Sequence, residues 1–246
     1  MATKTMITTF ESTGAKLRFG KMPPADLGML DAAVDEIEGQ LEAKPPIELY
    51  GKICHQQRDV GFFANPEVTY GYFYSGTVAQ SKPPGSAIAA LLAYVNAEFG
   101  AEFNGVLVNQ YHGGADYISD HSDSEAGLDP NTGVIAISAG ATRTMRFKRA
   151  KAAPVGTPNF KYGAYKINLD HGSIVHMQGP EFQRSFTHGI PPEAKAVGSR
   201  VSFTFRKHSG ENEAKRIAAA EKTMKRIAEK KAAAAEEGPA AKRAKV

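Results

Sequence analysis

The sequence contains a single cysteine and no long apolar run. Cys54 alone cannot form an internal disulfide, and we interpret it as an ordinary reduced thiol in a reducing compartment. No stretch of about 18 or more apolar residues occurs, and residues 1–11 lack the apolar segment of a secretory signal. We therefore expect a soluble, intracellular protein that has no contact with a membrane.

The sequence also has little net charge outside its C-terminal end. The whole chain of 246 residues carries a formal charge of +4. Residues 209–246 contain ten Lys or Arg and six Asp or Glu, so this segment accounts for all of the excess. Because the remaining body is formally neutral, a phosphate-binding surface there would have to come from local clustering of basic side chains.

Two helices are predicted in the N-terminal half. Residues 26–41 repeat apolar side chains at helical spacing behind Asp26, the expected N-cap, and an adjacent pair of prolines is expected to end the helix. Residues 86–99 show the same spacing, with Ser86 as the expected cap and Gly100 as the stop. Both helices are expected to lie against a sheet.

From residue 103 onward the pattern changes to short runs that are typical of strands and are separated by turn residues. These runs are Gly105–Tyr111, Gly133–Ser138, Thr142–Lys148, Tyr165–Leu169, Ser173–Met177 and Arg200–Arg206. Many short strands after two helices predict a mainly β domain with flanking helices, either a β-sandwich or a jelly roll.

The C-terminal segment is predicted to be a charged helical tail. Residues 211–237 are rich in Ala, Lys and Glu, and their thin apolar stripe of Ile217, Met224 and Ile227 favours a solvated helix. The chain then closes with Ala-Ala-Lys-Arg-Ala-Lys-Val, which is similar to a one-part nuclear localisation signal. We expect an import receptor to recognise it and direct the protein to the nucleus. The alternative is a generic basic tail on a cytoplasmic protein.

Three residues are candidate metal ligands. His121-Ser122-Asp123 places an imidazole and a carboxylate two residues apart, and on an extended segment both point to the same side. Two His and one carboxylate on one face of an octahedron leave three positions open, as in non-haem iron(II) oxygenases. We expect the third ligand at His188, in a short apolar strand that ends at a turn. A His-x-Asp triplet alone is more commonly a surface turn.

Three other histidines are weaker candidates than His188 for the third metal ligand. His171 is expected in a hairpin turn, and His208 lies at the edge of the tail. His176 competes more directly, although its surroundings favour a packed or hydrogen-bonded core histidine.

The segment Arg200–Arg206 has the clearest alternation in the chain. One face carries Arg200, Ser202, Thr204 and Arg206, and the other carries Val201, Phe203 and Phe205. Two buried arginines need anionic partners, and a dicarboxylate such as 2-oxoglutarate offers bidentate ones. Asn109 and Tyr111, also two residues apart, are expected to point at the same pocket. The alternative is an edge strand with two solvated arginines.

The order of these motifs resembles that of the AlkB family of nucleic-acid demethylases. Asn-x-Tyr, His-x-Asp, Gly-Ala-Thr-Arg, a distal His and Arg-Val-x-x-Thr-Phe-Arg follow one another between about Tyr50 and Lys207. The resemblance implies a double-stranded β-helix, or jelly roll, with helices behind one sheet. It implies that iron(II) is held by His121, Asp123 and His188, and that the co-substrate 2-oxoglutarate is bound by Asn109, Tyr111, Arg200, Thr204 and Arg206.

The resemblance also divides the chain and implies a reaction. Residues 1–48 become an N-terminal extension with a buttressing helix, 49–208 a dioxygenase domain, and 209–246 the tail. The implied reaction oxidises an N-methyl group with oxygen and 2-oxoglutarate and releases formaldehyde, succinate and carbon dioxide. The leading hypothesis is repair of 1-methyladenine or 3-methylcytosine in DNA by a monomeric enzyme. The alternatives are methylated RNA, another 2-oxoglutarate oxygenase substrate such as a protein or lipid, and a nucleic-acid-binding module that has lost catalysis.

A methylated base of this kind is cationic, so its pocket should offer aromatic faces and a carboxylate. The run Tyr72-Phe73-Tyr74 resembles the aromatic lid of DNA-repairing family members, with the two tyrosines as pocket walls and Phe73 turned to the other face. Ser124 and Glu125 follow the metal motif, where Glu125 can supply the carboxylate. Without the resemblance, the aromatic run is more simply explained as core packing.

A second substrate contact is expected from Leu49-Tyr50-Gly51-Lys52. This segment resembles the finger that duplex-acting family members insert, with Tyr50 as the wedge and Lys52 beside it. The alternative is an ordinary strand end. Asn65-Pro66-Glu67 lacks the arginine that often follows this proline in the family, which leaves the choice between DNA and RNA open.

Overall fold

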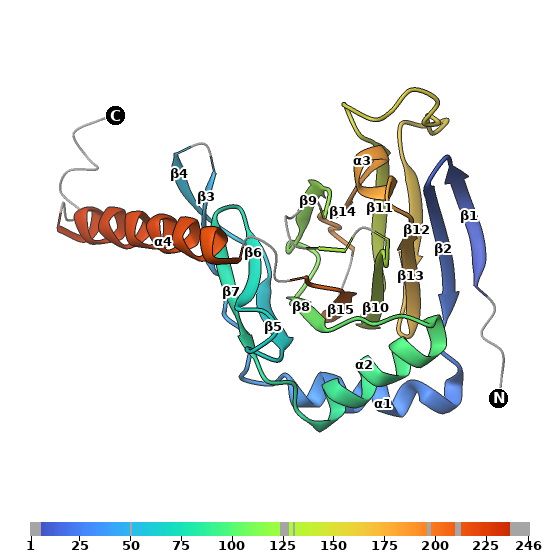
Figure 1. The fold of residues 1–246 in the computed structure, drawn as a ribbon, viewed down its shortest axis with the longest axis horizontal. Coiled ribbons are helices and arrows are strands. Elements are labelled where there is room, and N and C mark those ends of the chain that lie inside the picture. The colour runs from blue at the N-terminus through green and yellow to red at the C-terminus, as the bar shows by residue number, and fades with distance from the viewer. Residues whose placement is uncertain are drawn as a thin grey trace.

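The computed structural model describes residues 6–49, 51–123, 128–129, 131–195, 198–209 and 213–236, with side chains up to residue 232. Its largest element is a nine-stranded sheet in the order β1-β2-β13-β10-β15-β8-β5-β7-β6 (Figure 1). The strands are β1 (Ile7–Ser12), β2 (Ala15–Lys21), β13 (Ser173–Gln178), β10 (Val134–Gly140), β15 (Arg200–Arg206), β8 (Gly105–Tyr111), β5 (Asp59–Ala64), β7 (Thr77–Lys82) and β6 (Gly71–Tyr74).

Two smaller sheets complete the β structure. A four-stranded sheet runs in the order β12 (Tyr165–Leu169), β11 (Arg143–Arg149), β14 (Phe186–Ile190) and β9 (Ile118–His121). A separate hairpin consists of β3 (Pro46–Leu49) and β4 (Lys52–His55). The four-stranded sheet faces the large one across an apolar layer, to which β10, β11, β12 and β13 each contribute side chains.

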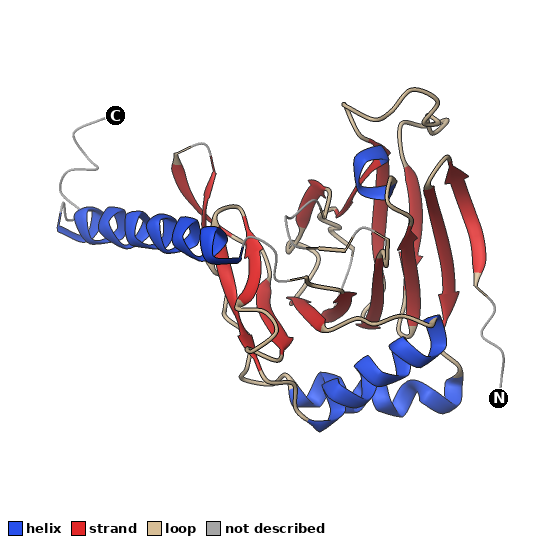
Figure 2. Ribbon diagram, in the orientation of Figure 1, coloured by secondary structure: helices blue, strands red, loops and turns tan. Residues whose placement is uncertain are grey.

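Two helices cover the opposite face of the large sheet. They are α1 (Leu27–Glu36) and α2 (Ser86–Phe99), which lie side by side beneath the strands (Figure 2). The alternation of β15 places Val201, Phe203 and Phe205 in this helix-facing layer, as predicted. The chain is therefore mainly β, with a jelly-roll arrangement and flanking helices, and the predicted fold class is confirmed.

The first helix is shorter than predicted. α1 ends at Glu36 rather than near residue 41, because the backbone turns at Gly39, whose φ of 69° suits glycine. Ile37 and Leu41 still pack against the helix-facing core, which explains why their spacing looked helical. Asp26 does occupy the N-cap position, although its side chain forms no capping hydrogen bond.

The second helix has the predicted bounds but a different cap. Gly85, not Ser86, is its N-cap residue. The carboxylate of Glu36 in α1 accepts hydrogen bonds from the backbone N–H groups of Ala87 at 2.7 Å and Ile88 at 3.1 Å. A Cβ on Gly85 would lie 2.5 Å from that carboxylate, so a larger residue there would displace the Glu36 side chain from its present position. Gly100 ends α2 in the left-handed conformation, as expected.

The predicted strands all occur within about two residues of their expected bounds. Strands β1 to β7 were not predicted; β1 and β2 extend the large sheet on one side and β5, β7 and β6 on the other, whereas β3 and β4 form the separate hairpin. β2 pairs with β13, so the N-terminal residues belong to the large sheet, and β5 pairs with β8. These pairings are non-local, and the alternation within each short segment does not reveal them.

The charged tail forms one long helix, α4 (Glu213–Glu236), at the end of the molecule away from β1 and β2 (Figure 1). It packs against β7 and β3 rather than standing free in solvent. None of the helices in the described ranges combines the length and apolar character needed to cross a membrane. The basic C-terminal cluster lies outside the described residues.

Candidate active site

The three predicted metal ligands meet between the nine-stranded and the four-stranded sheets. His121 is the last residue of β9, Asp123 follows two residues later, and His188 lies in β14 directly opposite His121. One ligand atom from each residue lies within 4.8 Å of the other two. The pairing of β9 with β14 therefore joins a His-x-Asp motif to a histidine 67 positions away from its first residue.

The donor atoms of this cluster fit a metal ion. Nδ1–H of His121 donates to the carbonyl of Ser119 at 2.9 Å, which leaves Nε2 as the free lone pair. Oδ1 of Asp123 accepts from Nη2 of Arg206 at 2.8 Å. Oδ2 of Asp123 is buried and has no hydrogen-bond partner among the described residues. A buried anionic oxygen without a partner is costly, and a cation bound between the imidazoles removes that cost.

The protonation states also suit metal binding. Burial, with a smaller contribution from His121, lowers the pKa of His188 to about 3. Burial likewise lowers the pKa of His121. Burial alone would raise the pKa of Asp123, but Arg206 and then the two histidines outweigh it, so this pKa lies below its usual range. The site thus combines neutral imidazoles with a carboxylate anion, which is the form that binds a metal.

Arg143 holds the backbone around the ligands. Its side chain is 1% exposed and donates to the carbonyls of Gly113 at 3.0 Å, Asp116 at 2.8 Å and Pro191 at 2.8 Å. These carbonyls flank the segments that lead into β9 and out of β14. The arginine of the Gly-Ala-Thr-Arg motif is therefore a structural tie between the two ligand-bearing strands.

The polar face of β15 lines the same cavity, as its alternation predicted. Arg200 and Arg206 are 2% and 4% exposed, and Thr204 lies between them. Arg206 lies at the metal end beside Asp123. Arg200 lies at the other end, where it donates to Ser138 Oγ at 2.8 Å and stands 5.3 Å from the ring of Tyr111. Burial lowers the pKa of Arg200, so an anion in the cavity would relieve an unfavourable charge.

The tyrosines of the predicted lid form another wall of the cavity. Tyr72 and Tyr74 both line it, and the ring of Tyr74 meets that of His121 edge-on at 6.3 Å. The alternation of β6 thus directs both tyrosines to the metal side. The guanidinium of Arg206 lies 4.9 Å from the centre of the Tyr72 ring, so the tyrosine wall meets the polar face of β15.

Arg58 is a site residue that sequence reasoning missed. It is 5% exposed, lines the cavity, and donates through Nε to Oδ1 of Asn109 at 2.7 Å. Its guanidinium lies 5.5 Å from the ring of Tyr74. The sequence lacks the arginine that often follows this proline, Pro66, in the family. Arg58, directly before β5, nevertheless brings an arginine into the cavity. A charged residue immediately before the apolar run of β5 was the available signal.

Other predicted substrate residues do not line the cavity or lie outside the described residues. Phe73 points to the other face of β6, as expected, where the guanidinium of Arg216 lies 4.2 Å from its ring centre. Lys52 is exposed at the start of β4 and does not line the cavity. The structure does not describe Tyr50, Ser124 and Glu125.

The three histidines considered as alternative third ligands occupy other environments. His171 lies in the hairpin turn before β13, and its Nε2 is 3.6 Å from Asp31. His176 packs edge-on against Phe99 at 5.4 Å in the core. His208 was expected at the edge of the tail, but it is 3% exposed and packs 5.0 Å from the ring of Phe62.

Comparison with known proteins agrees with this geometry. A family model described as "2OG-Fe(II) oxygenase superfamily" matches residues 29–206. DNA oxidative demethylase ALKBH2 of Homo sapiens is 29% identical over 181 residues, covering 72% of this chain and 68% of that protein. The protein of the same name from Arabidopsis thaliana is 31% identical over 182 residues, covering 66% of this chain and 57% of its own length. The structure of OsALKBH1 superposes with a TM-score of 0.52 at 16% identity, covering 82% of this chain and 100% of that one, which supports the fold.

Proposed function

The chain belongs to the 2OG-Fe(II) oxygenase superfamily, and on that premise we propose that it demethylates N-alkylated bases in DNA. Proteins of this family use iron(II), 2-oxoglutarate and oxygen, and the chain is accordingly a dioxygenase. The observation that carries the proposal is the single cavity in which the His121, Asp123 and His188 cluster faces the rings of Tyr72 and Tyr74. Similarity to proteins named DNA oxidative demethylase supports DNA as the substrate.

We propose that the polar face of β15 binds 2-oxoglutarate. Arg200 would pair with one carboxylate, because it is buried and its side-chain partner Ser138 is a neutral hydroxyl. Asn109, Tyr111 and Thr204 line the cavity beside it and would supply the remaining polar contacts. Arg206, the other arginine predicted to bind 2-oxoglutarate, also pairs with the Asp123 carboxylate and would thereby hold that carboxylate in place for the metal. Bound iron, together with oxygen and 2-oxoglutarate, supplies the oxidising chemistry.

The tyrosine wall would hold the base. A 1-methyladenine or 3-methylcytosine is cationic, and the face of a tyrosine ring attracts a cation by roughly 0.5 to 2 kcal/mol. Tyr74 stands next to the metal ligand His121, so a base stacked on it would place its methyl group near the reacting centre. The target base has to leave the helical stack to reach this cavity, which favours damaged or single-stranded bases. The walls also exclude water from the reaction.

The proposal is tested by measuring formaldehyde and succinate with iron(II), ascorbate and 2-oxoglutarate. Matched oligonucleotides with and without one 1-methyladenine would be offered as single-stranded DNA, duplex DNA and RNA. We expect formaldehyde that depends on the methyl group and is greatest with DNA. Formaldehyde with RNA alone would indicate that the substrate is RNA. Succinate without any formaldehyde would indicate an oxygenase that acts on another substrate. Neither product would favour a binding module.

We also propose that the protein acts in the nucleus, directed there by the basic cluster Lys242-Arg243-Ala244-Lys245. Relatives named as DNA demethylases support a site of action at DNA. A fluorescent fusion should be nuclear with the wild-type tail and diffuse when these three basic residues are replaced by alanine. Equal distribution of the two fusions would contradict the proposal.

A further inference from the structure

Helix α4 lies beyond the part of the chain that the family model matches, yet it packs on the substrate side of the molecule. The match ends at residue 206, and α4 begins at Glu213. The helix lies against β7 and β3, and buries Ala220, Thr223 and Ile227. Figure 1 shows it beside the two hairpins β3–β4 and β6–β7, far from α1 and α2. Its contacts are therefore with these two hairpins and not with the helix-covered face of the large sheet.

The first turn of α4 holds the start of the lid. Oε1 of Glu213 accepts from the backbone N–H of Tyr70 at 2.6 Å and from Oγ1 of Thr69 at 3.0 Å. These two residues immediately precede β6, the strand that carries both cavity tyrosines. The guanidinium of Arg216 covers the outer face of the same strand at Phe73. The N-terminal end of α4 thus contacts both the residues that precede β6 and the outer face of β6.

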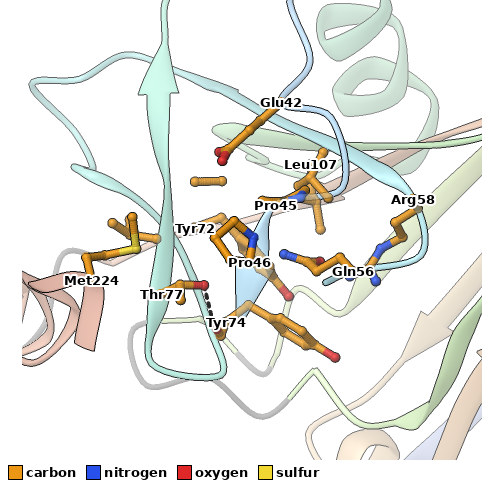
Figure 3. Close-up of a pocket in the computed structure, with 13 residues that line it drawn as sticks. Glu42, Pro45, Pro46, Gln56, Arg58, Tyr72, Tyr74, Thr77, Leu107 and Met224 are labelled. Atoms are coloured by element: carbon orange, nitrogen blue, oxygen red, sulfur yellow. Dashed lines mark hydrogen bonds between the residues drawn. The ribbon is translucent and has the colours of Figure 1, made fainter. Parts of the chain in front are cut away.

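The middle of α4 closes the lid hairpin and a cavity behind it. A Cβ on Gly76, in the turn between β6 and β7, would lie 3.1 Å from Oγ1 of Thr223, so helix and turn are in close contact. The side chain of Met224 lines a second cavity together with Tyr72 and Tyr74 (Figure 3). The same two tyrosines also line the cavity of the candidate metal ligands, so the cavity beside α4 and the candidate active site share this wall.

The far part of α4 holds the β3–β4 hairpin. Nζ of Lys230 lies 2.8 Å from Oε1 of Glu48 and also donates to the carbonyl of Gly51 at 2.8 Å. Arg226 pairs with the other carboxylate oxygen of Glu48, whose side chain is only 6% exposed. The hairpin has no strand pairing with either larger sheet among the described residues, and an isolated hairpin is marginally stable. The Glu48 pairs therefore restrain an element that the sheets leave free.

We propose that α4 is a positioning element that joins the β3–β4 and β6–β7 hairpins, so that both present one fixed surface to a polynucleotide substrate. Its positioning residues are Glu213 toward the lid, and Arg226 and Lys230 acting through Glu48. The proposal rests on the proposed function for the identity of the substrate. The main contacts of α4 are with β7 and β3, whereas the candidate metal ligands and Arg200 lie on or next to β9, β14 and β15, so binding of metal and 2-oxoglutarate should not depend on the helix.

Glu48→Gln separates positioning from simple charge attraction. The substitution removes a negative charge, so electrostatics alone predicts tighter binding of a polyanionic substrate. Loss of the ion pairs to Arg226 and Lys230 predicts the opposite, because the hairpin would lose its fixed position. We expect the KM for a methylated DNA oligonucleotide to rise about threefold to tenfold. The kcat and the KM for 2-oxoglutarate should stay at wild-type values.

Glu229→Gln is the matched control, because it makes the same chemical change at an exposed position on α4. Hydrogen exchange gives a second readout that needs no turnover. In E48Q, backbone amides of residues 47–55 should exchange faster than in wild type, whereas those of β10 should be unchanged. E229Q should match wild type in both measurements.

The two readouts keep the proposals distinguishable. Wild-type protein without methyl-dependent turnover would defeat the proposed function, and exchange in the β3–β4 hairpin would still decide whether α4 holds it. Unchanged exchange in E48Q would overturn the positioning proposal, as would a KM for DNA that is unchanged or lower. Faster exchange together with a raised KM for DNA and an unchanged KM for 2-oxoglutarate is the result that the proposal requires.

Discussion

Replacing Arg206 by glutamine measures how strongly its buried ion pair with Asp123 stabilises the site. The two side chains are 4% and 0% exposed, and their charged atoms lie 2.8 Å apart. Unit charges about 4 Å apart attract by ~4 kcal/mol at an effective dielectric constant of ~20. Removing one partner leaves a buried carboxylate without compensation, which costs about 3 to 5 kcal/mol. We expect R206Q to lower the free energy of unfolding of the metal-free protein by that amount.

Urea denaturation followed by far-UV circular dichroism, with a chelator present, gives this free energy. The matched control is R146Q, because Arg146 pairs with Asp120 through side chains that are 28% and 20% exposed. Loss of that partly exposed pair should cost about 1 kcal/mol or less. The double variant R206Q/D123N, which removes both buried charges, should recover much of the loss. Equal stability of R206Q and R146Q, or no recovery in the double variant, would refute the reasoning.

Two further predictions concern His208 and Arg200. Burial, followed by Arg206 and Arg216, lowers the pKa of His208 to about 3. The unfolded chain therefore takes up a proton at this residue below about pH 6.5 that the folded protein resists, and the contribution of His208 to stability should fall by about 1.4 kcal/mol per pH unit between pH 6.5 and 3. H208F, which keeps a ring against Phe62, should reduce that slope in urea titrations between pH 7 and 5, and an unchanged slope would contradict this. Arg200→Met should raise the KM for 2-oxoglutarate about tenfold or more, since a charged hydrogen bond contributes about 1.5 to 3 kcal/mol. A wild-type KM in a folded variant would exclude Arg200 from co-substrate binding.

Much of the candidate site follows from patterns that are local in sequence. The two-residue spacing of His121 and Asp123 and the alternation of Arg200–Arg206 each place side chains on one face of an extended segment, and the structure confirms both arrangements. The structure also brings His188 next to His121, because their strands pair. The role of Arg143 as a tie between loops was not apparent, since its partners are backbone carbonyls from three separate segments.

The remaining features depend on contacts between distant segments. Arg58 enters the site because β5 pairs with β8, and no pattern around residue 58 specifies that pairing. The tail helix was expected to be solvated because its apolar stripe is thin. The helix docks through hydrogen bonds and ion pairs of Glu213, Arg226 and Lys230. Such polar contacts cannot be predicted from the spacing of apolar residues. His208 is buried because its ring packs against Phe62, a residue of the distant strand β5.

The most direct test of the account is an anaerobic titration of the purified protein with iron(II), followed calorimetrically. We predict one ion per wild-type chain and no binding at that site in Asp123→Ala, with the circular dichroism spectrum of the variant unchanged. Asp120→Ala removes a carboxylate one residue before His121 that pairs with Arg146 and Lys148, and this control should still bind one ion. Wild-type stoichiometry and affinity in Asp123→Ala would contradict the assignment of the metal centre.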